Sequence, residues 1–199
     1  MEHVSPPAMG SGPPPTMNHV GITVPDVIAA IDWYREVFGF RCLMGPRVLL
    51  PPGGAVPSPL GPRFRRAWQA HLVTADGVGL ELFQFIDPPV EQAPRDIVFW
   101  RPGPWHLCLT HPDVGALAGR IVRAGGVQRH EPVHFVPGRP YQLVYCGDPW
   151  GTVIELMSHP YTEVFANWPQ PGMTQPTTYV DPVTRTELSP RPLPDWPPQ

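Results

Sequence analysis

The sequence predicts an α+β fold made of two βαβββ modules that pack together. Short apolar runs with strand character and two helical patterns follow each other in an order that occurs twice along the 199 residues. In both repeats the first apolar run contains a His and the last contains a Glu. Each module is too small to bury its sheet alone, so we expect the two to share a core.

The first repeat begins with a strand at about 18–24, followed by a helix from Pro25-Asp26 to Phe38. Apolar residues at helical spacing predict the helix, Asp26 is a plausible N-cap, and Gly39 is a stop signal. The Asp76-Gly77 pair predicts a hairpin. The other strands are expected at about 41–49, 66–75 and 78–86.

The second repeat has the same order. A strand at about 105–110 meets Pro112-Asp113, and a helix continues to Gly125-Gly126. The remaining strands are expected at about 127–135, 141–146 and 151–157.

Proline is abundant, with 32 residues, and it marks the boundaries of the modules. Pro-rich segments with little hydrophobic periodicity predict flexible or surface-wrapping extensions. The stretch 51–63 predicts a long loop inside the first module. We expect a flexible arm at 1–16, modules at 17–86 and 104–159, a linker at 87–103 and a C-terminal extension at 160–199.

Composition excludes several classes of function. A net charge of −3 with 16% charged residues gives no basic surface for nucleic acid or anionic lipid. No apolar run is long enough to span a membrane, and the N-terminus lacks the features of a signal peptide, so we expect a cytoplasmic protein. The three separated cysteines argue against a disulfide framework or a structural zinc site. The absence of Lys rules out lysine Schiff-base chemistry.

His19, Glu81, His106 and Glu155 are the candidate site residues. Two imidazoles and two carboxylates suit a divalent cation with nitrogen and oxygen ligands. Strand alternation gives each of them small or apolar neighbours on its own face. A carboxylate is costly in such surroundings unless it is paired or bound to metal. The neighbours proposed to bind substrate are Thr23, Phe83, Phe85, Cys108 and Met157. Surface or packing roles are expected for His71, His111, His130, His134 and His159.

The segments HVGITVPDVIAAIDWYREVFGF, WHLCLT and YCGDPWGTVIELMSHP resemble the vicinal oxygen chelate superfamily. This superfamily includes glyoxalase I, extradiol dioxygenases and the fosfomycin and bleomycin resistance proteins. The resemblance covers about 17–159 and implies paired modules that form a curved, cup-like mixed sheet around one metal. It implies His19, Glu81, His106 and Glu155 as ligands of the glyoxalase I pattern, or three of them without Glu81 as the iron ligands of the dioxygenase pattern.

Three functions follow from this resemblance. We expect a glyoxalase-like isomerase or lyase acting on a small substrate with adjacent oxygens, in which Glu81 or Glu155 carries the proton. Thr23 stands where glyoxalase I has an Arg that holds glutathione, so we expect no dependence on glutathione. The alternatives are an Fe²⁺ dioxygenase acting on a phenol and an antibiotic-binding resistance protein. The expected cofactor is one Fe²⁺, Ni²⁺, Co²⁺, Zn²⁺ or Mn²⁺ ion. The modules could pair within one chain or across a homodimer.

Overall fold

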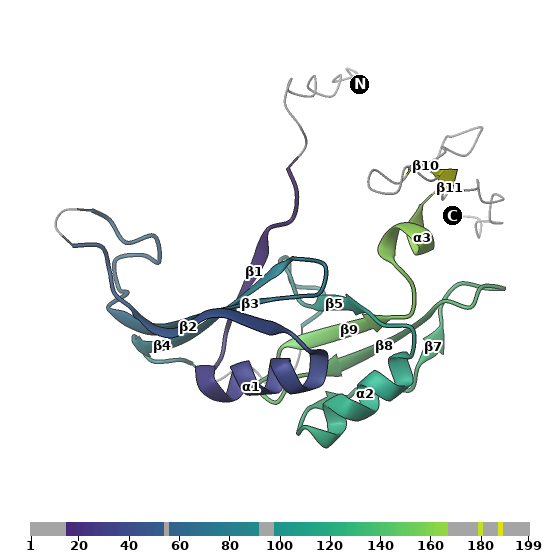
Figure 1. Cartoon of the computed structure of the whole chain (residues 1–199), viewed down its shortest axis with the longest axis horizontal. Coiled ribbons are helices and arrows are strands. Elements are labelled where there is room, and N and C mark those ends of the chain that lie inside the picture. Colours follow the sequence, from purple (N-terminus) through teal and green to yellow (C-terminus); the bar gives the residue numbers. More distant parts are fainter. Residues whose placement is uncertain (1–14, 54–55, 92–97, 167–178, 181–186, 189–199) are drawn as a thin grey trace, which may run out of the picture. The chain divides into compact units, whose positions relative to one another are not determined.

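The computed structural model describes residues 15–53, 56–91 and 98–166, together with two short strands at 179–180 and 187–188 (Figure 1). The chain divides into two compact units, 1–90 and 91–199. Each unit contains a β-strand, an α-helix and then further strands that form one mixed sheet. The predicted α+β class with two βαβββ modules is confirmed.

The first unit forms a sheet in the order β1-β4-β3-β2. Strand β1 is parallel to β4, and the other neighbours are antiparallel. This parallel pairing places the first strand of the module beside its last, and it aligns His19 at the start of β1 with Gly79 at the start of β4. The elements are β1 (His19–Thr23), α1 (Val27–Phe38), β2 (Arg41–Leu49), β3 (Arg66–Val73) and β4 (Gly79–Asp87).

Helix α1 covers one face of this sheet (Figure 1). Asp26 caps it by accepting hydrogen bonds from the backbone N–H groups of Ile28 and Ala29, at 2.9 and 3.0 Å. Gly39 ends it in the left-handed region, with φ of 73°. The buried side of the helix and the α1-facing side of the sheet supply the core residues Val27, Ala30, Ile31, Tyr34, Val37, Leu72, Leu80 and Leu82. The opposite face of the sheet is therefore left for the site.

The β3–β4 hairpin sets which residues share that face. Thr74 donates its backbone N–H to the Val78 carbonyl, so the loop has three residues, and its last, Gly77, has φ of 90°. A left-handed residue at this position is typical of a three-residue hairpin loop. The resulting register pairs His71 with Glu81 and Leu72 with Leu80.

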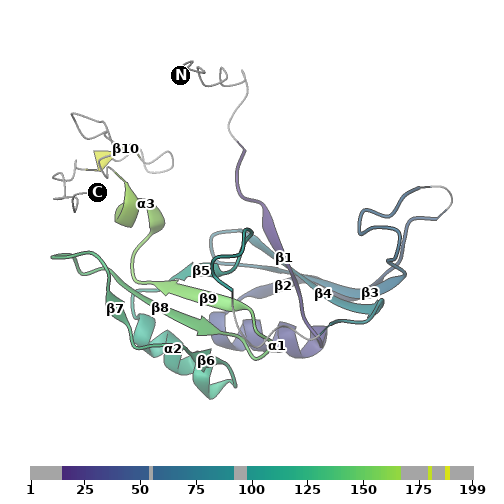
Figure 2. The same ribbon diagram turned by 180° about the vertical axis from the view of Figure 1, so that it is seen from behind.

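The second unit forms a five-stranded sheet in the order β5-β9-β8-β6, with β7 also paired to β8 (Figure 2). Strand β5 is parallel to β9, as β1 is to β4. Helix α2 packs on the sheet through Val114, Leu117, Ala118 and Ile121. The elements are β5 (Leu107–Thr110), α2 (Val114–Arg123), β6 (Val127–Gln128), β7 (Val133–His134), β8 (Gln142–Gly147) and β9 (Val153–Met157).

Two details of this unit differ from the sequence prediction. The strand expected at 127–135 is two short strands, β6 and β7, separated by a segment that contains Pro132. Proline has no N–H to donate to a neighbouring strand, which disfavours a continuous ladder there. Strand β5 begins at Leu107, so His106 lies just before the strand rather than within it.

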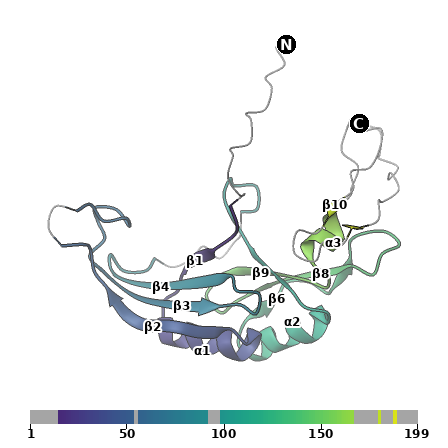
Figure 3. The same cartoon turned by 45° about the horizontal axis from the view of Figure 1, so that its top comes forward.

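A third helix, α3 (Tyr161–Phe165), follows β9 and lies on the side of the sheet opposite α2 (Figure 3). Val164 is fully buried and packs with Val136, Tyr141 and Met157. The sequence pattern gave no indication of this helix, nor of β10 (Tyr179–Val180) and β11 (Glu187–Leu188), which pair with each other. Among the described residues, no helix is long and apolar enough to span a membrane.

Candidate functional site

His19 and Glu81 form a pair on the exposed face of the first unit's sheet. Their side chains approach diagonally from β1 and β4, because His19 is aligned with Gly79 and Gly21 with Glu81. His19 Nε2 lies 3.6 Å from Glu81 Oε2. His19 Nδ1 is 2.7 Å from Asn18 Oδ1, an arrangement in which Nδ1–H donates to the amide oxygen. This tautomer leaves the lone pair of Nε2 available beside the carboxylate.

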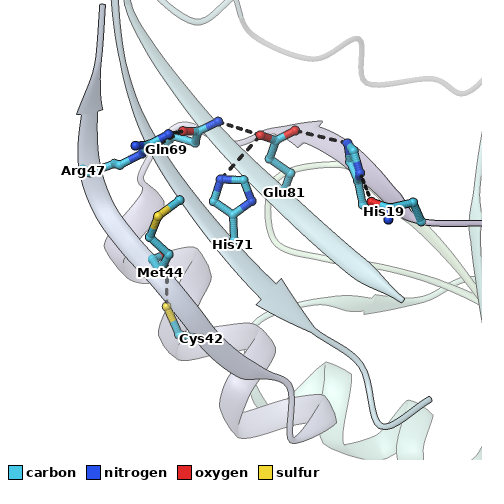
Figure 4. A network of polar contacts seen from close by, with 8 residues as sticks. His19, Cys42, Met44, Arg47, Gln69, His71 and Glu81 are labelled. Atoms are coloured by element: carbon cyan, nitrogen blue, oxygen red, sulfur yellow. Dashed lines mark hydrogen bonds and ion pairs between the residues drawn. The ribbon is translucent and has the colours of Figure 1, made fainter. Parts of the chain in front are cut away.

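The other oxygen of Glu81 is held by a chain of hydrogen bonds (Figure 4). Gln69 donates from Nε2 to Glu81 Oε1 at 2.6 Å. Arg47 donates from Nε and Nη2 to Gln69 Oε1, at 3.1 and 2.9 Å. Because a guanidinium group can only donate, it fixes the amide oxygen of Gln69 towards Arg47 and the amide nitrogen towards Glu81. Gln69 is 6% exposed, so this carboxylate oxygen is occupied by a buried donor.

His71 is a second imidazole beside Glu81, although a surface or packing role was expected for it from the sequence. It lies directly across from Glu81 on β3, with Nε2 3.6 Å from Glu81 Oε1. That nitrogen is buried and has no hydrogen-bond partner among the described residues. Figure 4 shows the rings of His71 and His19 approaching the carboxylate from different sides. The signal that could have found His71 is the hairpin register, which places residue 71 opposite residue 81.

His106 and Glu155 form the matching pair in the second unit. His106 Nε2 lies 3.2 Å from Glu155 Oε2. Glu155 is 9% exposed in the middle of β9, where the preceding and following residues are also buried. The ring of Trp105 lies 4.1 Å from that of His106, and Tyr145 meets the same ring edge to face at 5.9 Å. His106 Nδ1 is buried without a hydrogen-bond partner among the described residues.

Two donors flank Glu155 on the neighbouring strands. Cys108 on β5 and Tyr145 on β8 are both aligned with Glu155, and both side chains hydrogen-bond its carboxylate. Burial, followed by the charge and hydrogen bond of Glu155, raises the pKa of the Cys108 thiol. Burial and the Glu155 carboxylate likewise raise the pKa of the Tyr145 phenol. Both groups therefore stay protonated at neutral pH and act as donors.

The donor types suit a divalent cation, and the separation of the second pair falls within the range expected of two ligands of one ion, while that of the first pair is slightly longer. Ligand nitrogen and oxygen atoms bind such an ion at about 2.1 Å, so two ligands of one ion lie roughly 3.0–3.4 Å apart. The two His–Glu separations are 3.6 and 3.2 Å. Among the described residues, no group of three or more His, Cys, Asp and Glu side chains is gathered in a way that could hold a metal ion. Each unit thus presents two candidate ligands, which is half of a typical four-ligand set.

The residues proposed to bind substrate differ in accessibility. Thr23 is exposed at the end of β1, while Phe83 and Phe85 are half-buried and stacked at 5.7 Å. Met157 is 3% exposed and packs in the cluster under α3.

His130 has a structural role, because its Nε2 accepts a hydrogen bond from the backbone N–H of Tyr145 at 3.0 Å.

Comparison with known proteins identifies the family of the chain. The family model described as Glyoxalase/Bleomycin resistance protein/Dioxygenase superfamily matches residues 16–156. A glyoxalase family protein from Bacillus cereus is 25% identical, with a TM-score of 0.61 over 75% of this chain and 97% of its own. Glyoxalase I from Zea mays is 23% identical, with a TM-score of 0.49 over 72% of this chain and 44% of its own. The fosfomycin resistance protein FosX from Listeria monocytogenes is 14% identical, with a TM-score of 0.49 over 77% and 95%. No curated protein matches the sequence.

Proposed function

The chain belongs to the Glyoxalase/Bleomycin resistance protein/Dioxygenase superfamily, and we propose that it is a metal-dependent isomerase or lyase acting on a small substrate with two adjacent oxygen atoms. The observation that carries the proposal is the repetition of one arrangement. Each unit places a His, at or just before the start of its first strand, about 3–4 Å from a Glu in the parallel last strand.

We propose His19, Glu81, His106 and Glu155 as the ligands of one divalent ion, either Fe²⁺, Ni²⁺, Co²⁺, Zn²⁺ or Mn²⁺. Neutral imidazole and carboxylate ligands suit these ions, and two pairs complete a four-ligand set. The two pairs would come from the two units of one chain or from two copies of the chain in a homodimer. Two observations support this assignment. The tautomer of His19 leaves its Nε2 free to bind a metal ion. Glu155 is buried, and burial of a carboxylate costs free energy that a bound cation would offset.

A bound divalent ion would polarise the adjacent substrate oxygens. The two glutamates of the site would then have different roles. Glu155 accepts hydrogen bonds from Tyr145 and Cys108, which keep its carboxylate in place. Glu81 has fewer donors, and Gly21 beside it has no side chain to crowd Oε2. We therefore assign proton transfer at the substrate carbon to Glu81 rather than to Glu155.

Thr23, Phe83, Phe85 and Cys108 are proposed to contact the substrate. They extend the faces on which the two pairs lie, and the stacked Phe rings favour an apolar or aromatic group. Thr23 offers no charge for a glutathione carboxylate, which supports a substrate other than a glutathione adduct. Met157, buried under α3, would support the floor of the site rather than line it.

One observation favours the dioxygenase as a second candidate. His19 Nε2 and Glu81 Oε2 lie 3.6 Å apart, farther than two ligands of one ion, whereas His106 Nε2 and Glu155 Oε2 lie 3.2 Å apart. This longer separation favours a Glu81 that does not bind the metal directly. In that case His19, His106 and Glu155 would hold Fe²⁺ and leave positions open for oxygen and substrate. Iron content together with oxygen consumption in the presence of catechols distinguishes this candidate from the isomerase.

Metal binding by matched glutamate variants tests the proposal. Calorimetric titration of the full chain with Ni²⁺, Zn²⁺ and Fe²⁺ should give one ion per chain for the wild type. Glu81→Gln/Glu155→Gln should lose this binding, while Glu36→Gln/Glu131→Gln, which changes two exposed carboxylates, should keep it. A wild-type chain that binds no ion, or equal binding by both double variants, would exclude a metal-dependent enzyme built on these residues.

A further inference from the structure

Arg47 lies on the same face as the His19–Glu81 pair. The strand register aligns Arg47 with Gln69 and Gln69 with Phe83, and this row is next to the row that contains His71 and Glu81. Arg47 is thus two hydrogen bonds away from Glu81 Oε1, through the amide of Gln69 (Figure 4). An anionic group bound by Arg47 would lie beside the proposed reaction site.

The charge of Arg47 is held in place but not neutralised. Its Nε and Nη2 atoms donate to Gln69 Oε1, which is a neutral acceptor. None of the ion pairs among the described residues includes Arg47. One edge of the guanidinium group, formed by Nε and Nη2, is therefore held by Gln69, and the N–H groups of Nη1 have no partner in the described part of the chain. The free edge, formed by Nη1 and Nη2, matches a carboxylate, which accepts two parallel hydrogen bonds.

The surface next to Arg47 is apolar. Phe83, in the same row, stacks on Phe85 with an interplanar angle of 17°. The ring of Phe64 meets that of Phe85 edge to face, with the ring centroids 6.0 Å apart, and Phe64 is 3% exposed. The face thus offers a fixed cation, an aromatic surface and the His19–Glu81 pair along adjacent rows of one sheet.

We propose that Arg47 binds an anionic group of the substrate, so that the substrate class is a small organic acid. Its carboxylate would be separate from the two adjacent oxygens and would be joined to them by a short apolar or aromatic body. This inference rests on the proposed function for the position of the adjacent oxygens. It adds the charge of the substrate and the residue that recognises it.

Binding of matched probes to the nickel-loaded full chain tests the proposal. The probes are 3,4-dihydroxybenzoate and its methyl ester, which share the adjacent oxygens and the ring but differ in charge. The wild type should bind the acid at least about ten-fold more tightly than the ester, the effect of one hydrogen bond to a charged group. Arg47→Met should remove this preference, because any effect that reaches Glu81 through Gln69 lowers the affinity for both probes alike, whereas the loss of the cation weakens the acid only. Arg41→Met, which removes a charge from an exposed position on the same strand, should keep it.

Other outcomes overturn the proposal. Equal affinity of the wild type for both probes, or the same preference in Arg47→Met, would show that Arg47 is only a solvated strand residue. If the wild-type chain binds no nickel, the proposed function fails, and the metal-free chain then tests Arg47 by itself. There the side-chain amide resonance of Gln69 should shift on titration with the acid and not with the ester, and this response should disappear in Arg47→Met. No shift with either probe would exclude the anion site.

Discussion

Gln69 donates a hydrogen bond from Nε2 to Glu81 Oε1 at 2.6 Å, and it thereby determines which carboxylate oxygen stays available. Oε2 is the oxygen that lies beside His19 Nε2. The orientation of Gln69 is in turn imposed by the two donors of Arg47. The position of a candidate ligand on β4 is therefore set by residues on β2 and β3.

Replacing Gln69 with Leu should weaken metal binding more than it weakens the fold. Leu has a similar volume but leaves Glu81 Oε1 without its donor, and such a loss costs about 1–3 kcal/mol. We expect a metal affinity about ten-fold lower in calorimetric titrations. The control is Gln128→Leu, at a half-buried position in the other unit, which should keep the wild-type metal affinity. Unchanged affinity in Gln69→Leu would mean that Gln69 does not position Glu81.

Replacing Tyr145 with Phe should loosen Glu155 in the second unit. The phenol is a hydrogen-bond donor to this carboxylate and stays protonated because its pKa is raised by burial and by Glu155. Its removal leaves the packing of the ring intact but takes one hydrogen bond from Glu155, and a bond to a charged group contributes about 1.5–3 kcal/mol. We therefore expect a metal affinity about ten-fold lower than that of the wild type in calorimetric titrations. Unchanged metal affinity in Tyr145→Phe would contradict this role.

Gly79 should not tolerate a side chain. A Cβ atom at this position would lie 2.8 Å from Cβ of His19, which is aligned with Gly79 across the β1–β4 pair. Gly79→Ala would push β1 away from β4, and crowding of this kind costs about 1–3 kcal/mol. We expect a lower denaturation midpoint together with weaker metal binding. Gly53→Ala, where a Cβ meets nothing within 4 Å, should change neither property.

The three cysteines should react at different rates with iodoacetamide at pH 8, as followed by mass spectrometry. Burial raises the pKa of Cys146 to about 11, with Arg129 opposing part of the shift, so almost no thiolate forms at pH 8. Cys42 is exposed and should be labelled first. Burial and Glu155 raise the pKa of Cys108, so Glu155→Gln should speed its labelling. Labelling of Cys146 as fast as Cys42 in the folded chain would contradict this order.

Most of the fold could be predicted because strong local signals agree with the register. Helix α1 begins after its N-cap Asp26 and ends at Gly39, as expected from the sequence. The strand alternation that put Leu80 and Leu82 opposite Glu81 is confirmed by their burial under α1. The prediction of one strand over 127–135 was wrong because Pro132 has no N–H to donate to a neighbouring strand. Helix α3 has only five residues, too few for a helical period to show.

The residues around the candidate ligands were harder to predict. A two-residue turn at Asp76-Gly77 would pair residue 71 with residue 82, on the wrong face for Glu81. The actual three-residue loop shifts the register by one and brings His71 opposite Glu81. Gln69 and Arg47 have no motif of their own, and their role depends on that same register. The ligand set itself stays a prediction.

Anomalous diffraction from crystals grown with one equivalent of Ni²⁺, Zn²⁺ or Fe²⁺, with data at the absorption edge of that metal, tests the central claim most directly. We predict one strong peak per chain, within about 2.5 Å of Nε2 of His19 and His106 and of a carboxylate oxygen of Glu155. A carboxylate oxygen of Glu81 at the same distance would mark the isomerase pattern. The absence of a peak, or a peak bound to other residues, would contradict the account.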